Sequence, residues 1–217
     1  MKERRLSKAN WLGKGLYVLS LVFLAFGLFS IGWVVWPAPR EAVTINLPAG
    51  VLPGAPTGET YASLADYTLS VTWPGWLRAG EEGNIEVYLS EDEENLIEVD
   101  DRPVQVVMVQ PNVGSLSIEP SGQLQASMGP GQDLVLTWQI SGIEPRDHPG
   151  EMVVAFGFYD DALGELVTVP VAVVDIEVKI IRLFGLGSQL ILWFGLISLV
   201  FWGALFLFGR MIQKKLE

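Results

Sequence analysis

The sequence has 217 residues, of which half are apolar, and its mean hydropathy of +0.36 exceeds what a soluble domain needs. The net charge of −11, the absence of cysteine and the single histidine argue against a nucleic-acid-binding protein, a disulfide-stabilised domain and a zinc or copper site. Charge is uneven along the chain: residues 1–36 contain five basic and one acidic side chain, residues 37–180 five and 23, and residues 181–217 four and one.

The first predicted element is a membrane-spanning helix. Residues 15–36 contain no charged side chain, and at about 1.5 Å of rise per residue they match a hydrocarbon core of about 30 Å. The basic residues before this span are Lys2, Arg4, Arg5, Lys8 and Lys14. The positive-inside rule therefore places residues 1–14 in the cytoplasm. A cleaved signal peptide is the alternative, but the apolar run is too long for one and Trp36 is too bulky for a cleavage site.

Residues 37–60 are rich in proline and glycine, so they are predicted to form a linker with one short strand at 42–47. Apolar residues then alternate with period two, which predicts an all-β domain over residues 61–181, a sandwich of seven to nine strands. The clearest predicted strands are 69–73, 85–89, 104–108, 134–140, 152–158 and 167–181. The turns between them are predicted at Pro74–Gly75, Ala79–Gly80, Pro111–Asn112, Gly129–Gly131 and Pro149–Gly150.

The segment HPGEMVVAFGFYDDALGELVTVPVAV, residues 148–173, has a Pro-Gly turn, a strand that ends in an aromatic residue and aspartates, a short turn, and a strand through Pro170. In this order it resembles the last hairpin of the immunoglobulin-like or fibronectin-like domains of bacterial envelope proteins. The resemblance implies a fold of that class and no activity, because such folds host many unrelated functions. The absence of cysteine and of a glycosylation sequon also favours a prokaryotic envelope.

The stretch SEDEENLIEVDD, residues 90–101, places seven carboxylates in twelve residues. It could be a calcium site, a docking surface for a basic partner, or a solvated loop between strands. Because it lacks the alternation and the glycine of an EF-hand loop, we expect the solvated loop. The residues that would serve the other two interpretations are Glu91, Asp92, Glu93 and Glu94.

Two further ligand sites are considered. The hairpin YDDALGE could offer Asp160, Asp161 and Glu165 to calcium, although tight turns favour the same residue types. Trp76 could be a platform for a sugar or a protein partner. Trp73 and Trp138 alternate in phase with apolar neighbours, so we expect them in the core.

His148 is expected in an exposed turn. With Asp147 beside it, a Ser-His-Asp arrangement is formally possible, but the sequence has no G-x-S-x-G elbow. No glycine-rich phosphate loop is present either. We therefore expect neither catalysis nor a cofactor.

A second membrane-spanning helix is predicted at residues 189–209, after a short hinge at 182–188. The basic residues after it, Arg210, Lys214 and Lys215, place residues 210–217 in the cytoplasm and the acidic domain outside. Small residues in the two spans allow close helix packing, within the chain or against another membrane protein, and Gly195 and Gly203 are the candidates for the second role. No ionisable residue lies inside either span, which argues against a transporter.

These patterns predict a membrane-anchored all-β protein, with an immunoglobulin-like β-sandwich between two transmembrane α-helices, in a prokaryotic plasma membrane. We expect a non-catalytic accessory or scaffold subunit of an envelope complex. Its expected partners are the lipid bilayer and other membrane subunits or further copies of itself, and not nucleic acid. The alternative is an extracytoplasmic ligand-binding or adhesion module, with or without calcium.

Overall fold

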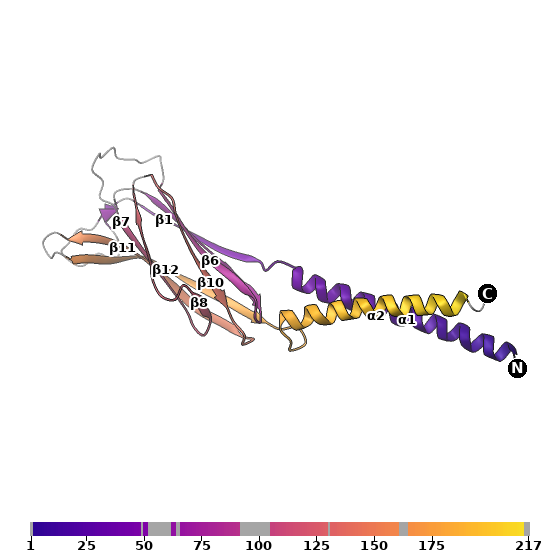
Figure 1. Cartoon of the computed structure of the whole chain (residues 1–217). Helices are drawn as coiled ribbons and strands as arrows, with labels where there is room; N and C mark the ends of the chain where they lie inside the picture. Colours follow the sequence, from indigo (N-terminus) through magenta and orange to yellow (C-terminus); the bar gives the residue numbers. More distant parts are fainter. Residues whose placement is uncertain are drawn as a thin grey trace. The chain divides into compact units, whose positions relative to one another are not determined.

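The computed structural model describes residues 2–48, 50–51, 62–63, 66–91, 105–129, 131–160 and 165–214. The chain forms two compact units (Figure 1). The first unit, Met1–Pro37 with Arg182–Glu217, contains helices α1 (Lys2–Val35) and α2 (Ser188–Lys214). The second unit, Ala38–Ile181, contains the strands.

Both helices contain a segment that is long and apolar enough to cross a membrane, Lys14–Val35 in α1 and Ser188–Lys214 in α2. The two spans predicted from the sequence are therefore helical and apolar. Helix α1 begins at Lys2 and not near residue 15, so the basic segment continues the helix. Its lysine, arginine, leucine and alanine residues have high helix propensity, and it contains no proline.

The two helices are antiparallel and pack through small residues. Their buried small residues are Ser20, Gly27 and Ser30 of α1 and Gly195, Ser198 and Gly209 of α2. A Cβ on Gly27 would lie 2.8 Å from Leu199 Cδ2, and one on Gly195 would lie 3.0 Å from Ser30 Cβ. The spacings of seven and three residues in α1, and of three and eleven residues in α2, keep these positions on one face of each helix, which lets the backbones approach closely.

The second unit is a sandwich of two five-stranded sheets with a separate two-stranded ribbon. The first sheet has the order β1-β4-β6-β10-β8, the second has the order β5-β12-β11-β7-β9, and β2 pairs with β3. The strands are β1 (Arg40–Leu47), β2 (Gly50–Val51), β3 (Ala62–Ser63), β4 (Tyr67–Pro74), β5 (Trp76–Arg78), β6 (Glu82–Glu91), β7 (Gln105–Val113), β8 (Ser117–Glu119), β9 (Leu124–Met128), β10 (Leu134–Ser141), β11 (Asp147–Asp160) and β12 (Glu165–Ile181). All pairs are antiparallel except β5 with β12.

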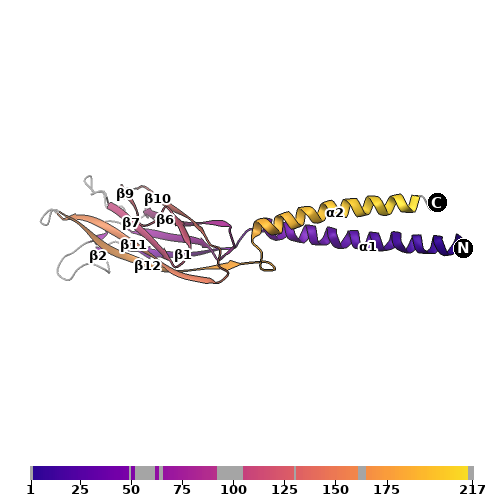
Figure 2. The same ribbon diagram turned by 60° about the horizontal axis from the view of Figure 1, so that its bottom comes forward.

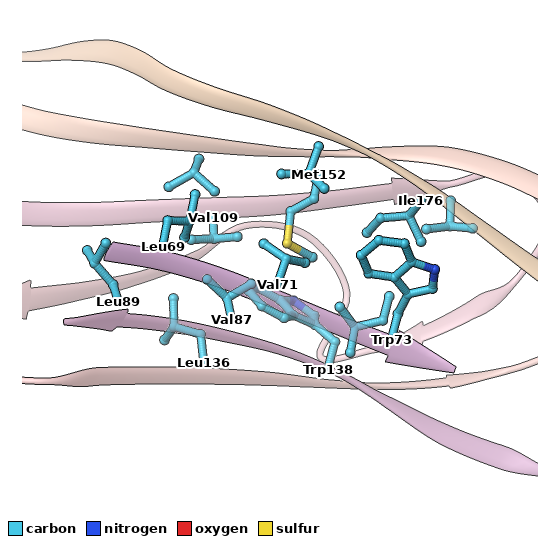
Figure 3. Close-up of a cluster of buried hydrophobic side chains, with 14 of the residues drawn as sticks. Leu69, Val71, Trp73, Val87, Leu89, Val109, Leu136, Trp138, Met152 and Ile176 are labelled. Atoms are coloured by element: carbon cyan, nitrogen blue, oxygen red, sulfur yellow. The ribbon is translucent and has the colours of Figure 1, made fainter. Parts of the chain in front are cut away.

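The apolar positions of the predicted strands fill the space between the two sheets. In Figure 3, Leu69 and Trp73 of β4 lie in the same cluster as Val109 of β7, Met152 of β11 and Ile176 of β12. These side chains are at most 4% exposed. Alternating burial along β4, β6 and β10 explains why the period-two pattern predicted these strands correctly.

Residues 40–47, expected in a linker with a short strand at 42–47, form the full edge strand β1. Every residue of β1 pairs with β4, from Arg40 opposite Pro74 to Leu47 opposite Tyr67. Leu47 is buried in the core. The sandwich therefore begins at β1 and not at residue 61.

Two predicted turns are wrong, because Pro111 lies within β7 and Pro149 within β11. Strand β9 pairs with β7 only as far as Val109, and β7 pairs with β11 only from Gly150 onward. At each proline, the strand therefore has a neighbouring strand on one side only. A proline nitrogen that faces the side without a neighbour costs no hydrogen bond of the sheet.

The hairpin β11–β12 is the longest pair in the sandwich (Figure 2). Its register shifts between Val154 and Ala155, which leaves Val171 as the extra residue of a β-bulge. The buried positions of β12 change phase there, from odd-numbered residues up to Val171 to even-numbered residues from Val174. The bulge therefore keeps both halves of one long strand facing the core.

Candidate functional site

One end of the sandwich is held together by polar contacts. Strand β1 begins and β12 ends there, and the loops before β6, after β7 and before β11 meet. Gly80 N donates to Gly142 O at 2.9 Å, and Ile180 N donates to Arg146 O at 2.9 Å. We call this end, residues 74–81, 113–117, 142–148 and 178–181, the base of the sandwich.

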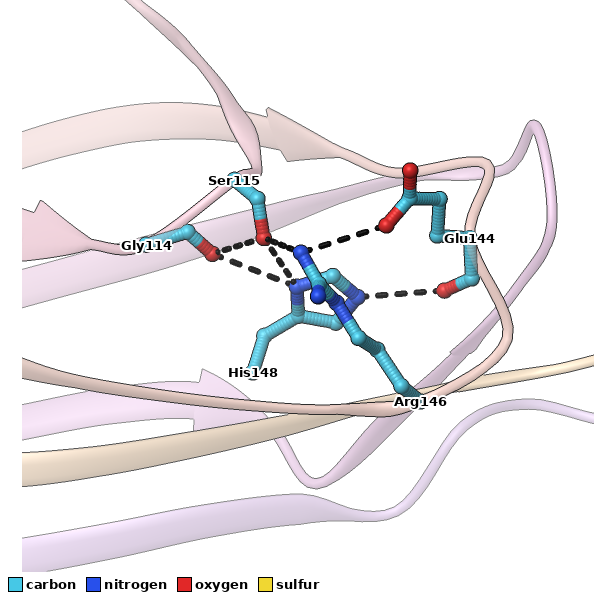
Figure 4. Close-up of polar contacts among 5 residues, drawn as sticks. All are labelled: Gly114, Ser115, Glu144, Arg146 and His148. Atoms are coloured by element: carbon cyan, nitrogen blue, oxygen red, sulfur yellow. Dashed lines mark hydrogen bonds and ion pairs between the residues drawn. The ribbon is translucent and has the colours of Figure 1, made fainter.

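His148 lies in the base and is 1% exposed, so its predicted position in an exposed turn is wrong. It is the second residue of β11, and both nitrogens of its ring face polar atoms (Figure 4). Nε2 lies 3.1 Å from Glu144 O, whereas Nδ1 lies 3.0 Å from Ser115 Oγ and 3.2 Å from Gly114 O. The ring therefore joins the loop after β7 to the loop before β11.

A neutral imidazole has one donor and one acceptor nitrogen, which leaves two proton arrangements. In the first, Nε2–H donates to Glu144 O and Nδ1 accepts from the Ser115 hydroxyl. In the second, Nδ1–H donates to Gly114 O, to which the Ser115 hydroxyl also donates at 2.6 Å. The first arrangement satisfies both ring nitrogens, so it is the one that we favour.

The remaining charged groups of this cluster are exposed. Arg146 donates to Ser115 Oγ and forms an ion pair with Glu144 at 3.1 Å. Asp147 pairs with Lys179 at 3.2 Å across β11 and β12. The carboxylate considered for a Ser-His-Asp arrangement therefore binds a lysine, and His148 is oriented by Glu144 O and the Ser115 hydroxyl.

Trp76, the proposed platform, lies in the base on β5 and is half-buried. The guanidinium carbon of Arg78 lies 4.7 Å from the centroid of its ring, a cation–π contact. Arg78 is 2% exposed, and its guanidinium binds Glu81 at 3.0 Å. One face of the Trp76 ring is thus covered by a buried cation, which reduces the ring area that a sugar could stack on.

The acidic candidates are only partly described. Glu91, the last residue of β6, is 9% exposed, and its carboxylate accepts from Gly131 N at 2.6 Å. It therefore joins β6 to the loop before β10, and it is not part of a solvated loop. Asp92, Glu93 and Glu94 lie outside the described residues.

Of the second set of calcium candidates, Asp160 ends β11 and Glu165 begins β12. Asp160 pairs in register with Glu165, and Asp161 lies outside the described residues. Within the described ranges, no three His, Cys, Asp or Glu side chains come together as a metal site.

The two glycines proposed to contact a partner differ. Gly195 lies between α1 and α2, so its close contact is used within the chain. A Cβ on Gly203 would meet no described atom within 4 Å. Docking of another membrane protein at Gly203 stays a prediction.

The contact between Tyr88 and Asp133 was missed from the sequence, because the two residues are far apart along the chain. The Tyr88 hydroxyl donates to Asp133 Oδ2 at 2.6 Å on the outer surface of the first sheet. This hydrogen bond to the carboxylate raises the pKa of Tyr88 above its usual value. Tyr88 lies opposite Val135, so cross-strand register brings its hydroxyl close to the residues that precede β10.

A scan against protein-family models gave no match, and a search of curated proteins gave none either. Among solved structures, the chain is similar to the CARDB domain of a Pyrococcus furiosus protein in complex with di-metal ions, with 16% identity, a TM-score of 0.32, and coverage of 51% of this chain and 84% of that one. A FixG-related protein from Vibrio parahaemolyticus gives 10% identity, a TM-score of 0.27 and coverage of 68% and 100%. AggA, the major subunit of aggregative adherence fimbriae type I from Escherichia coli, has 6% identity and a TM-score of 0.30. The similarity covers 67% of this chain and 98% of that one. Similarities at this level support no conclusion about the function of this chain.

Proposed function

We propose that this chain is a two-pass membrane protein whose helices hold the β-sandwich outside the cell, as a non-catalytic accessory or scaffold subunit of an envelope complex. The observation that carries the proposal is the antiparallel pair of apolar helices, one on each side of the sandwich in the sequence. The β-sandwich supplies a folded domain of its own between them.

The outward faces of the helix pair support insertion into lipid. Only one face of each helix is buried against the other, and large apolar side chains such as Leu21, Trp193 and Val200 remain more than 60% exposed. In water such a continuous apolar surface is unfavourable and marks an interaction site. In a bilayer the same surface contacts acyl chains, while each helix satisfies its own backbone hydrogen bonds.

The charges at the ends of the helices support the orientation. A Cβ on Gly209 would lie 3.7 Å from Leu16 Cβ, so the end of α2 lies beside the start of the α1 span. Lys14, Arg210 and Lys214 therefore flank the same end of the helix pair. The positive-inside rule assigns this end to the cytoplasm, which leaves the acidic sandwich outside.

The base of the sandwich supports a scaffold role more than a catalytic one. Its buried polar side chains bind one another or the backbone: Arg78 binds Glu81, and His148 binds Ser115 and Glu144. Such internal hydrogen bonds fix the loops in one arrangement. A rigid base suits a domain that positions a partner.

The proposal is tested by purifying the tagged full-length chain from native membranes in a mild detergent. We expect a companion membrane protein at a constant ratio to the chain across size-exclusion fractions. A Gly203→Leu variant tests the open face of α2, and Gly32→Leu is its control, because an added Cβ meets no described atom within 4 Å at either position. A chain that purifies alone from several mild detergents would contradict the proposal.

The alternative, a ligand-binding or adhesion module with or without calcium, predicts a different result. A bound ion stabilises a folded protein by mass action, about 2.7 kcal/mol at a hundredfold excess over its dissociation constant. A chelator should then lower the melting temperature of the full-length chain, and replacing Glu91, Asp92, Glu93 and Glu94 with serine should abolish that response. The scaffold proposal predicts no effect of the chelator.

A further inference from the structure

A tight turn connects β12 to α2. Leu186 N donates to Leu183 O at 2.9 Å, and the same two residues form an isolated β-bridge. The two central residues, Phe184 and Gly185, have φ angles of 52° and 75°. Positive φ at both central positions is the pattern of a type I′ turn, in which asparagine or glycine is the usual first central residue.

Phe184 is an unusual residue for this position. A bulky side chain is strained at positive φ, because its Cβ approaches the following carbonyl oxygen. Phe184 is also 73% exposed, so its ring gains little from packing within the chain. Neither the local conformation nor the packing of the described residues therefore accounts for an aromatic side chain here, which points to a contact outside the chain.

The turn lies at the end of the helix pair that is opposite to Lys14. It belongs to the helix unit, which includes residues 182–217, and in Figures 1 and 2 the connection from β12 turns beside the start of α2. A Cβ on Gly195 would lie 3.0 Å from Ser30 Cβ, so these two residues are level with each other. Ser188 precedes Gly195 by seven residues and Trp36 follows Ser30 by six, so both lie about 10 Å from this crossing at 1.5 Å per residue. The two apolar spans therefore end at the same level.

The position of the turn selects lipid as the partner of Phe184. The four residues from Phe184 to Ser188 span at most about 14 Å, and the reversal of the chain shortens this distance. The headgroup layer on each side of a bilayer is about 5–8 Å thick, so the ring lies within its reach. Trp36 at this level is 70% exposed, and aromatic residues gather at membrane interfaces. Phe184 thus continues the exposed apolar surface by which the helices would contact lipid.

We propose that this turn inserts Phe184 into the boundary between the headgroups and the acyl chains of the external leaflet. The ring has no hydrogen-bonding group, so its burial there desolvates no polar atom and offsets the strain at positive φ. The contact would hold the connection between the last strand of the sandwich and α2 at the membrane surface. This inference rests on the proposed insertion of the helices and adds an anchor that the spans do not supply.

Single spin labels test the depth of Phe184, because the chain has no cysteine of its own. The full-length Phe184→Cys, Ile197→Cys and Ser121→Cys chains are labelled and placed in lipid nanodiscs at one copy per disc. Oxygen concentrates in lipid, whereas a polar nickel complex remains in water. We expect oxygen to relax the label at position 184 strongly and nickel to relax it weakly, as at the lipid-exposed position 197 of α2. The label at the exposed position 121 of the sandwich should show the reverse.

The three labels distinguish the possible failures. Nickel access at position 184 equal to that at position 121 would overturn the proposal. Low access of both reagents would also overturn it, because protein and not lipid would then cover the residue. If position 197 is open to oxygen while position 184 is open to nickel, the insertion of the helices stands and only the anchor fails. Nickel access at position 197 would overturn the insertion as well.

A substitution that relieves the strain gives an independent test. Asparagine is favoured in this turn, so without a lipid contact the amides of residues 182–187 should exchange hydrogen no faster in Phe184→Asn than in the parent. With the anchor, we expect exchange in nanodiscs to be about tenfold faster, which is the scale set by partial burial of a phenylalanine side chain. Phe184→Trp should retain the parental rate, and the amides in the middle of α2 are the internal control. Exchange in Phe184→Asn that is equal to or slower than that of the parent would refute the anchor.

Discussion

Trp73 and Trp138 are both core residues, but their indole N–H groups have different surroundings. Trp73 Nε1 donates to Glu177 O at 3.2 Å, which links β4 of one sheet to β12 of the other. Trp138 is fully buried, and its Nε1 has no hydrogen-bond partner among the described residues. A buried donor without a partner costs about 1–3 kcal/mol of desolvation. The contribution of Trp138 therefore comes from its bulk and not from its polar group.

Replacing each tryptophan with phenylalanine separates these contributions. Both variants lose part of an aromatic ring, but Trp73→Phe also loses the hydrogen bond to Glu177 O. We expect the loss in free energy of unfolding to be larger for Trp73→Phe by about 1 kcal/mol or more. Thermal unfolding of the full-length chain, followed by near-ultraviolet circular dichroism, measures both. Equal losses would show that the bond between the sheets contributes nothing.

The Tyr88–Asp133 contact predicts a pH dependence. The hydrogen bond to Asp133 raises the pKa of Tyr88, so the folded protein keeps this proton more firmly than the unfolded chain does. The stability contributed by the contact is complete below the unfolded tyrosine pKa of about 10 and is lost as pH rises through the higher folded pKa. Asp133→Asn should move the phenolate absorbance of Tyr88 to lower pH. Subtracting the titration curve of a Tyr88→Phe chain leaves the signal of Tyr88 alone among the five tyrosines. An unchanged titration would mean that the contact is absent in solution.

The strands that the sequence predicted best are those in which the same face is buried from end to end. In β4, β6 and β10 buried and less buried residues alternate along the strand, so the period-two pattern is uninterrupted. The ends of β7 and β11 were missed because proline normally disfavours a strand, and only the lengths of the neighbouring strands show that Pro111 and Pro149 are tolerated. That information is tertiary and has no local signal.

The polar cluster in the base could not be predicted for the same reason. His148 precedes a Pro-Gly pair, which locally favours an exposed turn. Its partners Gly114 and Ser115 lie more than thirty residues away, on a loop that approaches only when β7 pairs with β11. The small residues of the helices, by contrast, were a usable signal, because their role depends on helical spacing alone.

The helix pair predicts opposite effects for two glycines of α1. At Gly27 an added Cβ would lie 2.8 Å from Leu199 and 3.1 Å from Gly195 O, whereas at Gly32 no described atom lies within 4 Å. Gly27→Leu should therefore force the helices apart, and Gly32→Leu should leave them packed. A disulfide between Leu16→Cys and Gly209→Cys, whose Cβ atoms would lie 3.7 Å apart, reports the packing when it is detected by mass spectrometry. We expect it to be lost in the Gly27→Leu background and retained with Gly32→Leu. Retention in both would argue against close helix contact.

At the scale of the whole molecule, charge is arranged in three blocks. The helix ends are basic, the helix spans are uncharged, and the sandwich carries most of the carboxylates. The described cations of the sandwich, Arg40, Arg78, Arg146 and Lys179, each pair with a carboxylate. The domain therefore presents an excess of acidic groups to its surroundings, which would resist transfer into a membrane and favour a fixed orientation.

This arrangement predicts a single topology that can be measured in intact cells. Because the chain has no cysteine, Ser121→Cys in the sandwich and Gln213→Cys near the end of α2 each create one thiol. Ser121 is exposed, so an impermeant maleimide should label its cysteine in intact cells, while the cysteine at position 213 should react only after the membrane is permeabilised. A reporter that is fluorescent only in the cytoplasm should give signal when fused to either terminus.

Three cations at the two apolar-to-charged boundaries of this end favour the predicted orientation: Lys14 before the first span, and Arg210 and Lys214 at the end of the second. Replacing all three with glutamine should weaken the bias and produce a mixed population, in which both cysteines are partly labelled. Protection of the cysteine at position 121 in intact cells carrying the parent charges would reverse the orientation, and with it the assignment of the acidic sandwich to the outside.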